Sequence, residues 1–175
     1  MKKLIISYSF SGNNALLAKN IAEKASADHT EIREFRKRNV FTIFLDTIFN
    51  RAPKIQPLQT TVKDYDHVIF VAPIWFGKIA SPFRQFFRQH RDQLTRYSFV
   101  SISGGANGTR PQVEKELKHL LGKAPFSLFQ SLICDLLPES QRGNQNALNA
   151  YRLTADEASY LSELALQNIL DTTTN

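Results

Sequence analysis

Short apolar segments alternate with longer segments of helical periodicity along this chain. The short segments predict strands at residues 4–8, 30–35, 67–72, 97–101 and 126–134, and the longer ones predict helices at residues 14–27, 40–49, 82–93, 112–121 and 154–170. Residues 67–72 are apolar at almost every position, which is typical of a strand buried on both faces of a parallel sheet. Strands that alternate with helices in this way predict an α/β fold with a doubly wound, open parallel sheet.

The predicted helix at residues 40–49 carries apolar side chains at helical spacing along one face. These are Val40, Phe41, Phe44, Leu45, Ile48 and Phe49. We predict that this face packs into the core against the sheet. The alternative is peripheral contact with a membrane or a partner, because basic residues lie directly before the helix.

Basic residues form two clusters in the sequence. They are Arg33, Arg36, Lys37 and Arg38 in the first, and Arg84, Arg88, Arg91 and Arg96 in the second. No nucleic-acid recognition motif accompanies them, so nucleic acid is not an expected partner. We interpret both clusters as solvated, arginine-rich surface.

In doubly wound sheets, ligands bind outside the carboxyl ends of the strands, near the point where the strand order reverses. The loop after the first predicted strand consists of Ser9, Phe10, Ser11, Gly12, Asn13 and Asn14. It opens a helix, whose first N–H groups bind anions, and its hydroxyls and amides add donors, so it predicts a phosphate site. It has no lysine or arginine and matches neither a Walker A loop nor a dinucleotide-binding glycine motif. A capped turn that binds nothing is the alternative.

Two further loops follow predicted strands and carry aromatic or glycine residues. The first contains Pro73, Ile74, Trp75, Phe76 and Gly77, and the second contains Ser103, Gly104, Gly105, Asn107 and Gly108. A large aromatic side chain can cover a planar ligand, and glycines let the backbone approach one closely. For the first loop, the alternative is that its aromatic side chains only pack over the end of the sheet. For the second loop, the alternative is a flexible connector. With the phosphate loop, the two loops predict one pocket that holds a phosphate at one end and a flat ring at the other.

At these residues the chain resembles the flavodoxin family. Residues 8–14 are similar to that family's FMN phosphate loop, and residues 64–77 and 101–105 resemble its third strand and its two ring-flanking loops. The resemblance spans essentially the whole chain and implies a three-layer sandwich with strand order 2-1-3-4-5 and one non-covalent FMN. By the same resemblance, Ser9, Ser11, Gly12, Asn13 and Asn14 hold the phosphate. Residues 73–77 line the ring with Trp75 or Phe76 stacked on it, and residues 103–108 lie along its other edge.

Composition narrows the class of protein further. The 175 residues fit one domain, expected over residues 1–171 with a frayed tail at 172–175, and the single cysteine excludes an intrachain disulfide. The apolar runs are too short for a transmembrane helix or a signal-peptide core, so a cytoplasmic protein is expected. The net charge of +6 departs from the acidic flavodoxins that shuttle electrons. We expect this charge on helix faces away from the phosphate loop, where it would suit an acidic partner.

These observations favour an FMN-dependent electron-transfer protein or small oxidoreductase. The cofactor carries the redox chemistry, so no catalytic residue and no metal ligand is assigned. The expected partner is a redox protein or a small molecule such as a quinone. One alternative is a reductase coupled to a quinone or NAD(P)H, because residues 74–78 and 86–90 loosely resemble flavodoxin-like protoporphyrinogen oxidases. Another is a binding or regulatory module of the same fold that holds no flavin, since residues 103–108 offer no second stacking aromatic.

Overall fold

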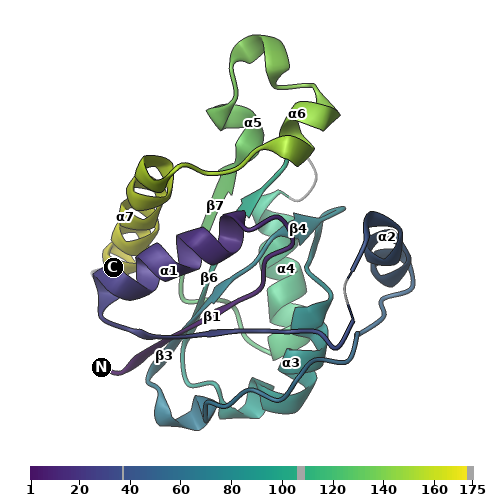
Figure 1. Cartoon of the computed structure of the whole chain (residues 1–175). Helices are drawn as coiled ribbons and strands as arrows, with labels where there is room; N and C mark the ends of the chain where they lie inside the picture. Colours follow the sequence, from purple (N-terminus) through teal and green to yellow (C-terminus); the bar gives the residue numbers. More distant parts are fainter. Residues whose placement is uncertain (37, 106–108, 173–175) are drawn as a thin grey trace.

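Five parallel strands form the central sheet, in the order β2-β1-β3-β6-β7 (Figure 1). This computed structural model describes residues 1–36, 38–105 and 109–172. The strands are β1 (Lys3–Ser7), β2 (Asp28–Glu31), β3 (His67–Val71), β6 (Tyr97–Ser103) and β7 (Leu128–Leu132). The order is that of the five predicted strands, 2-1-3-4-5, so the expected doubly wound α/β fold is confirmed.

Helices cover both faces of the sheet and make three layers (Figure 1). One face is covered by α1 (Asn13–Ala25) and α7 (Ala155–Asp171), and the other by α3 (Pro82–His90) and α4 (Arg110–Leu121). Alternate strand residues point to opposite faces, so Ile5 and Val71 join the core under α1 and α7, whereas Ile6 and Phe70 join the core under α3 and α4. This arrangement leaves the carboxyl ends of β1, β3 and β6 at one edge.

Several short elements were not expected from the sequence. A two-stranded antiparallel ribbon follows β3 and consists of β4 (Ile74–Trp75) and β5 (Lys78–Ile79). The segment before the last helix contains α5 (Ile133–Leu136) and α6 (Gln145–Ala150), and three single 3₁₀ turns lie at Val62–Asp64, Arg91–Gln93 and Glu139–Gln141. The ribbon fixes the direction of the Trp75 loop.

The second strand lies earlier in the chain than its predicted position at residues 30–35. Its register on β1 pairs Leu4 with Asp28 and Ser7 with Glu31, so β2 ends where β1 ends. Among the described residues of the segment that follows, only Ile32 bonds to β1, its N–H donating to the Ser7 carbonyl at 2.8 Å. The alternation from Glu31 to Phe35 was therefore misleading, because it describes a segment that leaves the sheet.

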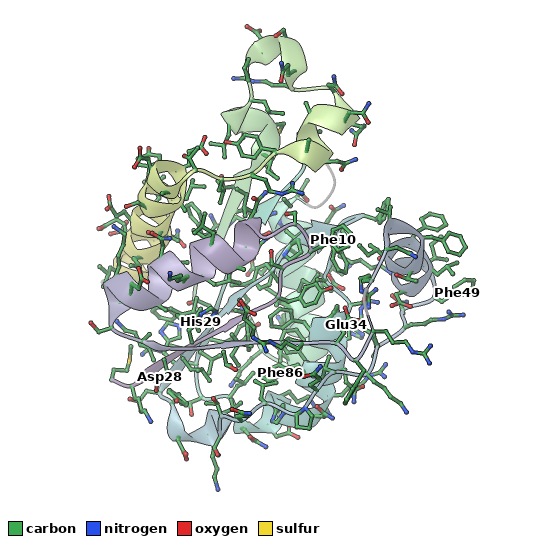
Figure 2. All side chains as sticks on the ribbon, viewed as in Figure 1. Phe10, Asp28, His29, Glu34, Phe49 and Phe86 are labelled. Atoms are coloured by element: carbon green, nitrogen blue, oxygen red, sulfur yellow. The ribbon has the colours of Figure 1, made fainter. Side chains whose placement is uncertain are left out.

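The helix α2 (Val40–Ile48) forms as predicted, but the prediction that its apolar face packs in the core is wrong. Within it only Ile43 and Thr47 are buried, while Phe41 is 67% exposed and Phe49, which follows it, is 61% exposed. Figure 2 shows the Phe49 side chain pointing away from the body of the molecule. The side chains of α3 already fill the core on this face of the sheet, with Phe83 and Phe86 fully buried, and α2 stands outside them (Figure 1).

In the described part of the chain, no helix combines the length and the apolar character that crossing a membrane would need. The expected domain boundary at residue 171 stays a prediction. Residues 173–175 of the expected tail lie outside the described residues.

Candidate functional site

The loop after β1 presents an open helix N-terminus. Gly12 is the N-cap of α1 and has φ 96°, and no side-chain cap hydrogen bond is found among the described residues. A Cβ atom added to Gly12 would meet nothing within 4 Å, so the space in front of the helix is free. The first helical hydrogen bond runs from the Leu16 N–H to the Gly12 carbonyl at 3.0 Å. The N–H groups of residues 13–15 have no partner inside the helix and can bind an anion.

The side chains of Asn13 and Asn14 hold this loop in place. Asn14 pairs with Ile102 of β6, donating to its carbonyl at 2.8 Å and accepting from its N–H at 3.1 Å. Asn13 donates to the Tyr151 carbonyl at 3.1 Å and accepts from the Leu153 N–H at 3.0 Å. Both residues are buried. What they can offer a phosphate is therefore mainly their backbone N–H groups, while their amides anchor the loop to β6 and to the segment before α7.

Two hydroxyl residues complete the loop. The Ser9 Oγ accepts a hydrogen bond from the Gly12 N–H at 3.0 Å, which closes the turn and leaves the Ser9 O–H free to donate. Ser11 is partly exposed at the same turn. These hydroxyls and the α1 N–H groups supply the donors that a phosphate needs.

Trp75 lies beside the phosphate loop. Its ring packs edge-on against Tyr8, with centroids 5.7 Å apart, and against Phe10, with centroids 6.3 Å apart. Phe76 points away from the phosphate loop. It has φ 49°, its side chain is 54% exposed, and its ring packs edge-on against Phe44 of α2 with centroids 5.8 Å apart. The structure thus brings Trp75 and Phe10 together at one end of the expected pocket. Phe10 supplies the second aromatic ring there, from the phosphate loop.

The loop after β6 leaves room for a ligand. Ser103 is buried at the end of the strand, and a Cβ atom on Gly104 or Gly105 would meet nothing within 4 Å. Asn107 and Gly108, which were also expected at this edge, lie outside the described residues. Ile102 directly precedes this loop, and the Asn14 side chain bonds to its backbone. These bonds tie the loop after β6 to the phosphate loop.

A network of charged groups lies at the same edge, which the sequence interpretation missed. Arg38 donates to Glu34 at 2.5 and 2.9 Å and to Asp46 at 2.8 Å, and Tyr8 donates to Glu34 at 2.8 Å. The Arg38 side chain is only 5% exposed, and its guanidinium lies 5.6 Å from the centre of the Trp75 ring. Burial, followed by the charge of Glu34, raises the pKa of Tyr8 above its usual value. The network fixes Tyr8 and Trp75 as a unit.

The position of this network corrects two expectations. Arg38 is buried and paired, not solvated. Arg33, Arg36 and Arg38 also line a pocket of about 570 Å³ together with Ser9, Phe10 and Gly12. Glu31 and Glu34 line it too and pair with Arg33 and Arg38, so the positive charge that Arg36 adds, unpaired among the described residues, lies beside the phosphate loop and not on a distant helix face. The arginine-rich segment directly after β2 was the signal in the sequence.

A larger cavity of about 970 Å³ lies on the other side of the Trp75 loop. It is bounded by Phe76 and Gly77 of the β4–β5 turn and by residues of α3 and α4. Arg84, expected on a solvated face, is only 4% exposed at this cavity. It lies 3.6 Å from the Glu116 carboxylate. Burial raises the pKa of Glu116, and a hydrogen bond from the Ile79 N–H opposes that rise.

The residues at the edge of the sheet fit a ligand with a phosphate and a flat ring. The uncapped α1, the free space at Gly12 and the hydroxyls suit the phosphate. Trp75 and Phe10 offer aromatic surface, and Gly104 and Gly105 leave space on the opposite loop. No cluster of histidine, cysteine, aspartate and glutamate that could hold a metal ion is found among the described residues.

Comparison with known proteins agrees with this geometry. Residues 46–130 match the flavodoxin domain family. A flavoprotein from Lactobacillus acidophilus, solved in complex with FMN, superposes with a TM-score of 0.65 and 22% identity, over 74% of this chain and 92% of that one. A putative flavoprotein from Bacteroides eggerthii superposes with a TM-score of 0.65 and 16% identity, over 86% of this chain and 99% of that one.

An archaeal flavodoxin superposes over almost the full length of both proteins. Its TM-score is 0.56 at 11% identity, over 99% of each chain. No curated protein matches the sequence. At these identities the solved structures establish the fold alone. The chain therefore has the flavodoxin fold, and residues 46–130 match the flavodoxin domain family.

Proposed function

We propose that this protein binds one FMN at the carboxyl edge of its sheet and acts as an electron-transfer flavoprotein or small flavin-dependent oxidoreductase. The observation that carries the proposal is the open N-terminus of α1, which has free space at Gly12 and lies beside the Trp75–Phe10 pair. The L. acidophilus flavoprotein of the same fold, solved in complex with FMN, supports it.

Each part of the site has a defined task in this proposal. The N–H groups of residues 13–15 and the hydroxyls of Ser9 and Ser11 hold the phosphate dianion, aided by the α1 dipole. Trp75, fixed by Tyr8 and Arg38, covers the apolar ring and excludes water from it. The bound FMN supplies one- and two-electron transfer, while the protein binds and orients it.

Reconstitution of the purified protein with FMN tests the proposal. Trp75 is the only tryptophan, so its emission reports directly on a ring bound beside it. We expect a yellow one-to-one complex in which Trp75 emission is strongly quenched. Folded protein that neither binds FMN nor loses Trp75 emission would contradict the proposal and favour a flavin-free binding module of the same fold.

Gly12→Glu tests the phosphate loop specifically. The new carboxylate would occupy the free space in front of α1, where it would both compete for the helix N–H groups and repel the phosphate. We expect FMN affinity to fall by about 100-fold or more, an amount typical of losing a charge-assisted site. Fluorescence titration of Trp75 measures it.

Two variants control for the other effects of this substitution. Gly12→Ala shares the backbone strain of a side chain at φ 96° but adds no charge, so it should lose far less affinity. Gly143→Glu adds the same charge at another glycine with free space around it and should bind FMN normally. If Gly12→Glu behaved like Gly143→Glu, the phosphate would have to bind elsewhere.

A reductase that transfers electrons to a small molecule is the second candidate function. The cavity of about 970 Å³ against Phe76 and Gly77 favours it, because a pure electron shuttle needs no such space beside the ring loop. Steady-state turnover of the FMN-loaded protein with NAD(P)H and a quinone distinguishes the two. Turnover only with a reduced protein partner would favour the shuttle.

A further inference from the structure

The larger cavity combines side chains from three separate elements. Lys115 and His119 lie one turn apart on α4, and Arg84 and Arg88 lie one turn apart on α3. The β4–β5 turn, which carries Phe76 and Gly77, closes one end of the cavity. Figure 1 shows α3 and α4 on the same face of the sheet, with this turn at their upper end. The cavity therefore has its own walls and is separate from the phosphate loop.

The cavity has a fixed, charged floor. The Arg84 Nη1 donates to the carbonyls of Asp46, at 3.0 Å, and of Arg51, at 3.4 Å. Its Nη2 is buried without a hydrogen bond and faces Glu116 at 3.6 Å, and Glu116 itself accepts from the Ile79 N–H at 2.7 Å. A buried guanidinium with an unused donor is costly unless a ligand or water satisfies it.

The walls carry positive charge that the protein does not neutralise. Among the described residues, none of Lys78, Arg88 and Lys115 has a carboxylate within 4.0 Å. Lys78 bonds only to neutral oxygens, those of Thr47 at 3.2 Å and Asn50 at 2.7 Å. Glu116 is the one acidic residue in the described lining, and Arg84 already faces it. The cavity consequently concentrates positive potential, which attracts anions.

Apolar surface lies next to this charge. Phe76 is 54% exposed, and Leu120 lines the cavity from the last turn of α4. A simple inorganic ion would leave both side chains uncovered, whereas a molecule with an acidic group and an apolar ring would cover them. We propose that this cavity binds an amphipathic small-molecule anion, with its acidic group on Arg88 and Lys115 and its apolar part against Phe76 and Leu120.

The binding claim stands without FMN, since none of these residues belongs to the phosphate loop. That the anion also exchanges electrons with a flavin rests on the proposed function. Phe76 and Gly77 belong to the loop that would flank the ring and also line the cavity, so a ligand there would lie next to the cofactor. The proposal thereby specifies the kind of acidic partner that the charge of +6 suggests.

Titration of the isotope-labelled protein, with and without FMN, tests the proposal by nuclear magnetic resonance. The probe is 1-naphthoate, and 1-naphthalenemethanol is the neutral probe with the same rings. We expect 1-naphthoate to shift the amide signals of residues 76–78 and 112–120, and to bind about tenfold more tightly than the alcohol, as expected for a charge-assisted contact.

A charge-matched pair of variants tests which cations are used. Arg88 and Lys115 are exposed, so R88Q/K115Q should fold normally and weaken 1-naphthoate binding by about tenfold. Arg91 and Lys118 are also exposed but do not line the cavity, and R91Q/K118Q removes the same total charge. It should change the affinity by less than about twofold.

Four results would overturn the proposal. These are an absence of shifts at millimolar probe, an equal loss of affinity in both double variants, equal affinity for the two probes, and shifts confined to the amide signals of α2. The FMN titration is read separately on the same samples. Protein that binds 1-naphthoate but no FMN would contradict only the proposed function, and protein that binds FMN but no 1-naphthoate would contradict only this inference.

Discussion

At the scale of single residues, His67 is the most perturbed histidine in the described chain. It is fully buried at the start of β3, where its Nε2 lies 2.9 Å from the Ser98 Oγ and its Nδ1 has no hydrogen-bond partner. Burial, followed by the charges of Arg96 and Lys3, lowers its pKa from 6.5 to about 4. His67 is therefore a neutral structural residue in the folded protein, far from the candidate site.

This lowered pKa predicts a loss of stability in mild acid. Between pH 6.5 and pH 4 the unfolded chain binds a proton at His67 that the folded chain does not, so the free energy of unfolding falls as the pH falls through this window. From pH 7 to pH 5 we expect His67 to contribute a loss of about 2 kcal/mol. Urea unfolding at both pH values measures it.

Two variants isolate the contribution of His67. His67→Gln should lose less stability than the wild type over this pH interval, although other groups such as His29, whose pKa burial also lowers, keep some pH dependence. Ser98→Ala removes the hydroxyl partner but keeps the buried imidazole, so it should retain the pH dependence of the wild type. Parallel stability curves for His67→Gln and the wild type would contradict the assignment.

At the scale of elements, the apolar pattern predicted which segments form structure better than where they pack. The strands of the sheet interior were found because β3 and β6 are apolar over most of their length. The edge strand β2 was misplaced, since one pairing partner constrains its register less. A helical apolar face likewise does not reveal whether the sheet is already covered, as it is by the α3 phenylalanines behind α2.

The candidate site shows the same limit. The three loops could be recognised because each directly follows a strand and has a distinctive composition. The burial of the Arg38 and Arg84 side chains could not be recognised from the sequence. It depends on Asp46 and Glu116, which the fold brings in from other elements. A polar side chain that anchors a loop, as Asn14 does on Ile102, also cannot be told from a ligand-binding one by residue type.

The exposed position of α2 leads to a prediction about two phenylalanines. Phe41→Ala on α2 removes a ring that is 67% exposed, so it should change the free energy of unfolding by less than about 0.5 kcal/mol. Phe86→Ala on α3 removes a fully buried ring and should cost about 3–5 kcal/mol (Figure 2). Chemical denaturation measures both. A large loss from Phe41→Ala would mean that α2 packs against something in solution.

At the scale of the whole molecule, the cations behind the net charge of +6 differ in their surroundings: some face carboxylates in the interior, and others open onto the two pockets. Arg38 and Arg84 face carboxylates in the interior, whereas Arg33 and Arg36 open onto the phosphate-loop pocket and Arg88 and Lys115 onto the larger cavity. Arg33 pairs with Glu31 at 3.8 Å, so, of these cations, those without a carboxylate partner among the described residues are Arg36 on one side of the Trp75 loop and Arg88 and Lys115 on the other. A charged electron acceptor that approaches this edge experiences the field of both groups.

This field predicts opposite salt dependences for two small electron acceptors. Given the proposed FMN site, the reduced protein should react with ferricyanide, an anion, several-fold more slowly when the ionic strength rises from about 0.01 M to about 0.3 M, because salt screens attraction. Its reaction with hexaammineruthenium(III), a cation, should become faster, because salt screens repulsion. Stopped-flow measurement of flavin reoxidation gives both rates. Equal trends for the two acceptors would mean that the edge of the sheet where electrons leave is not positively charged, and the case for an acidic partner would then fail.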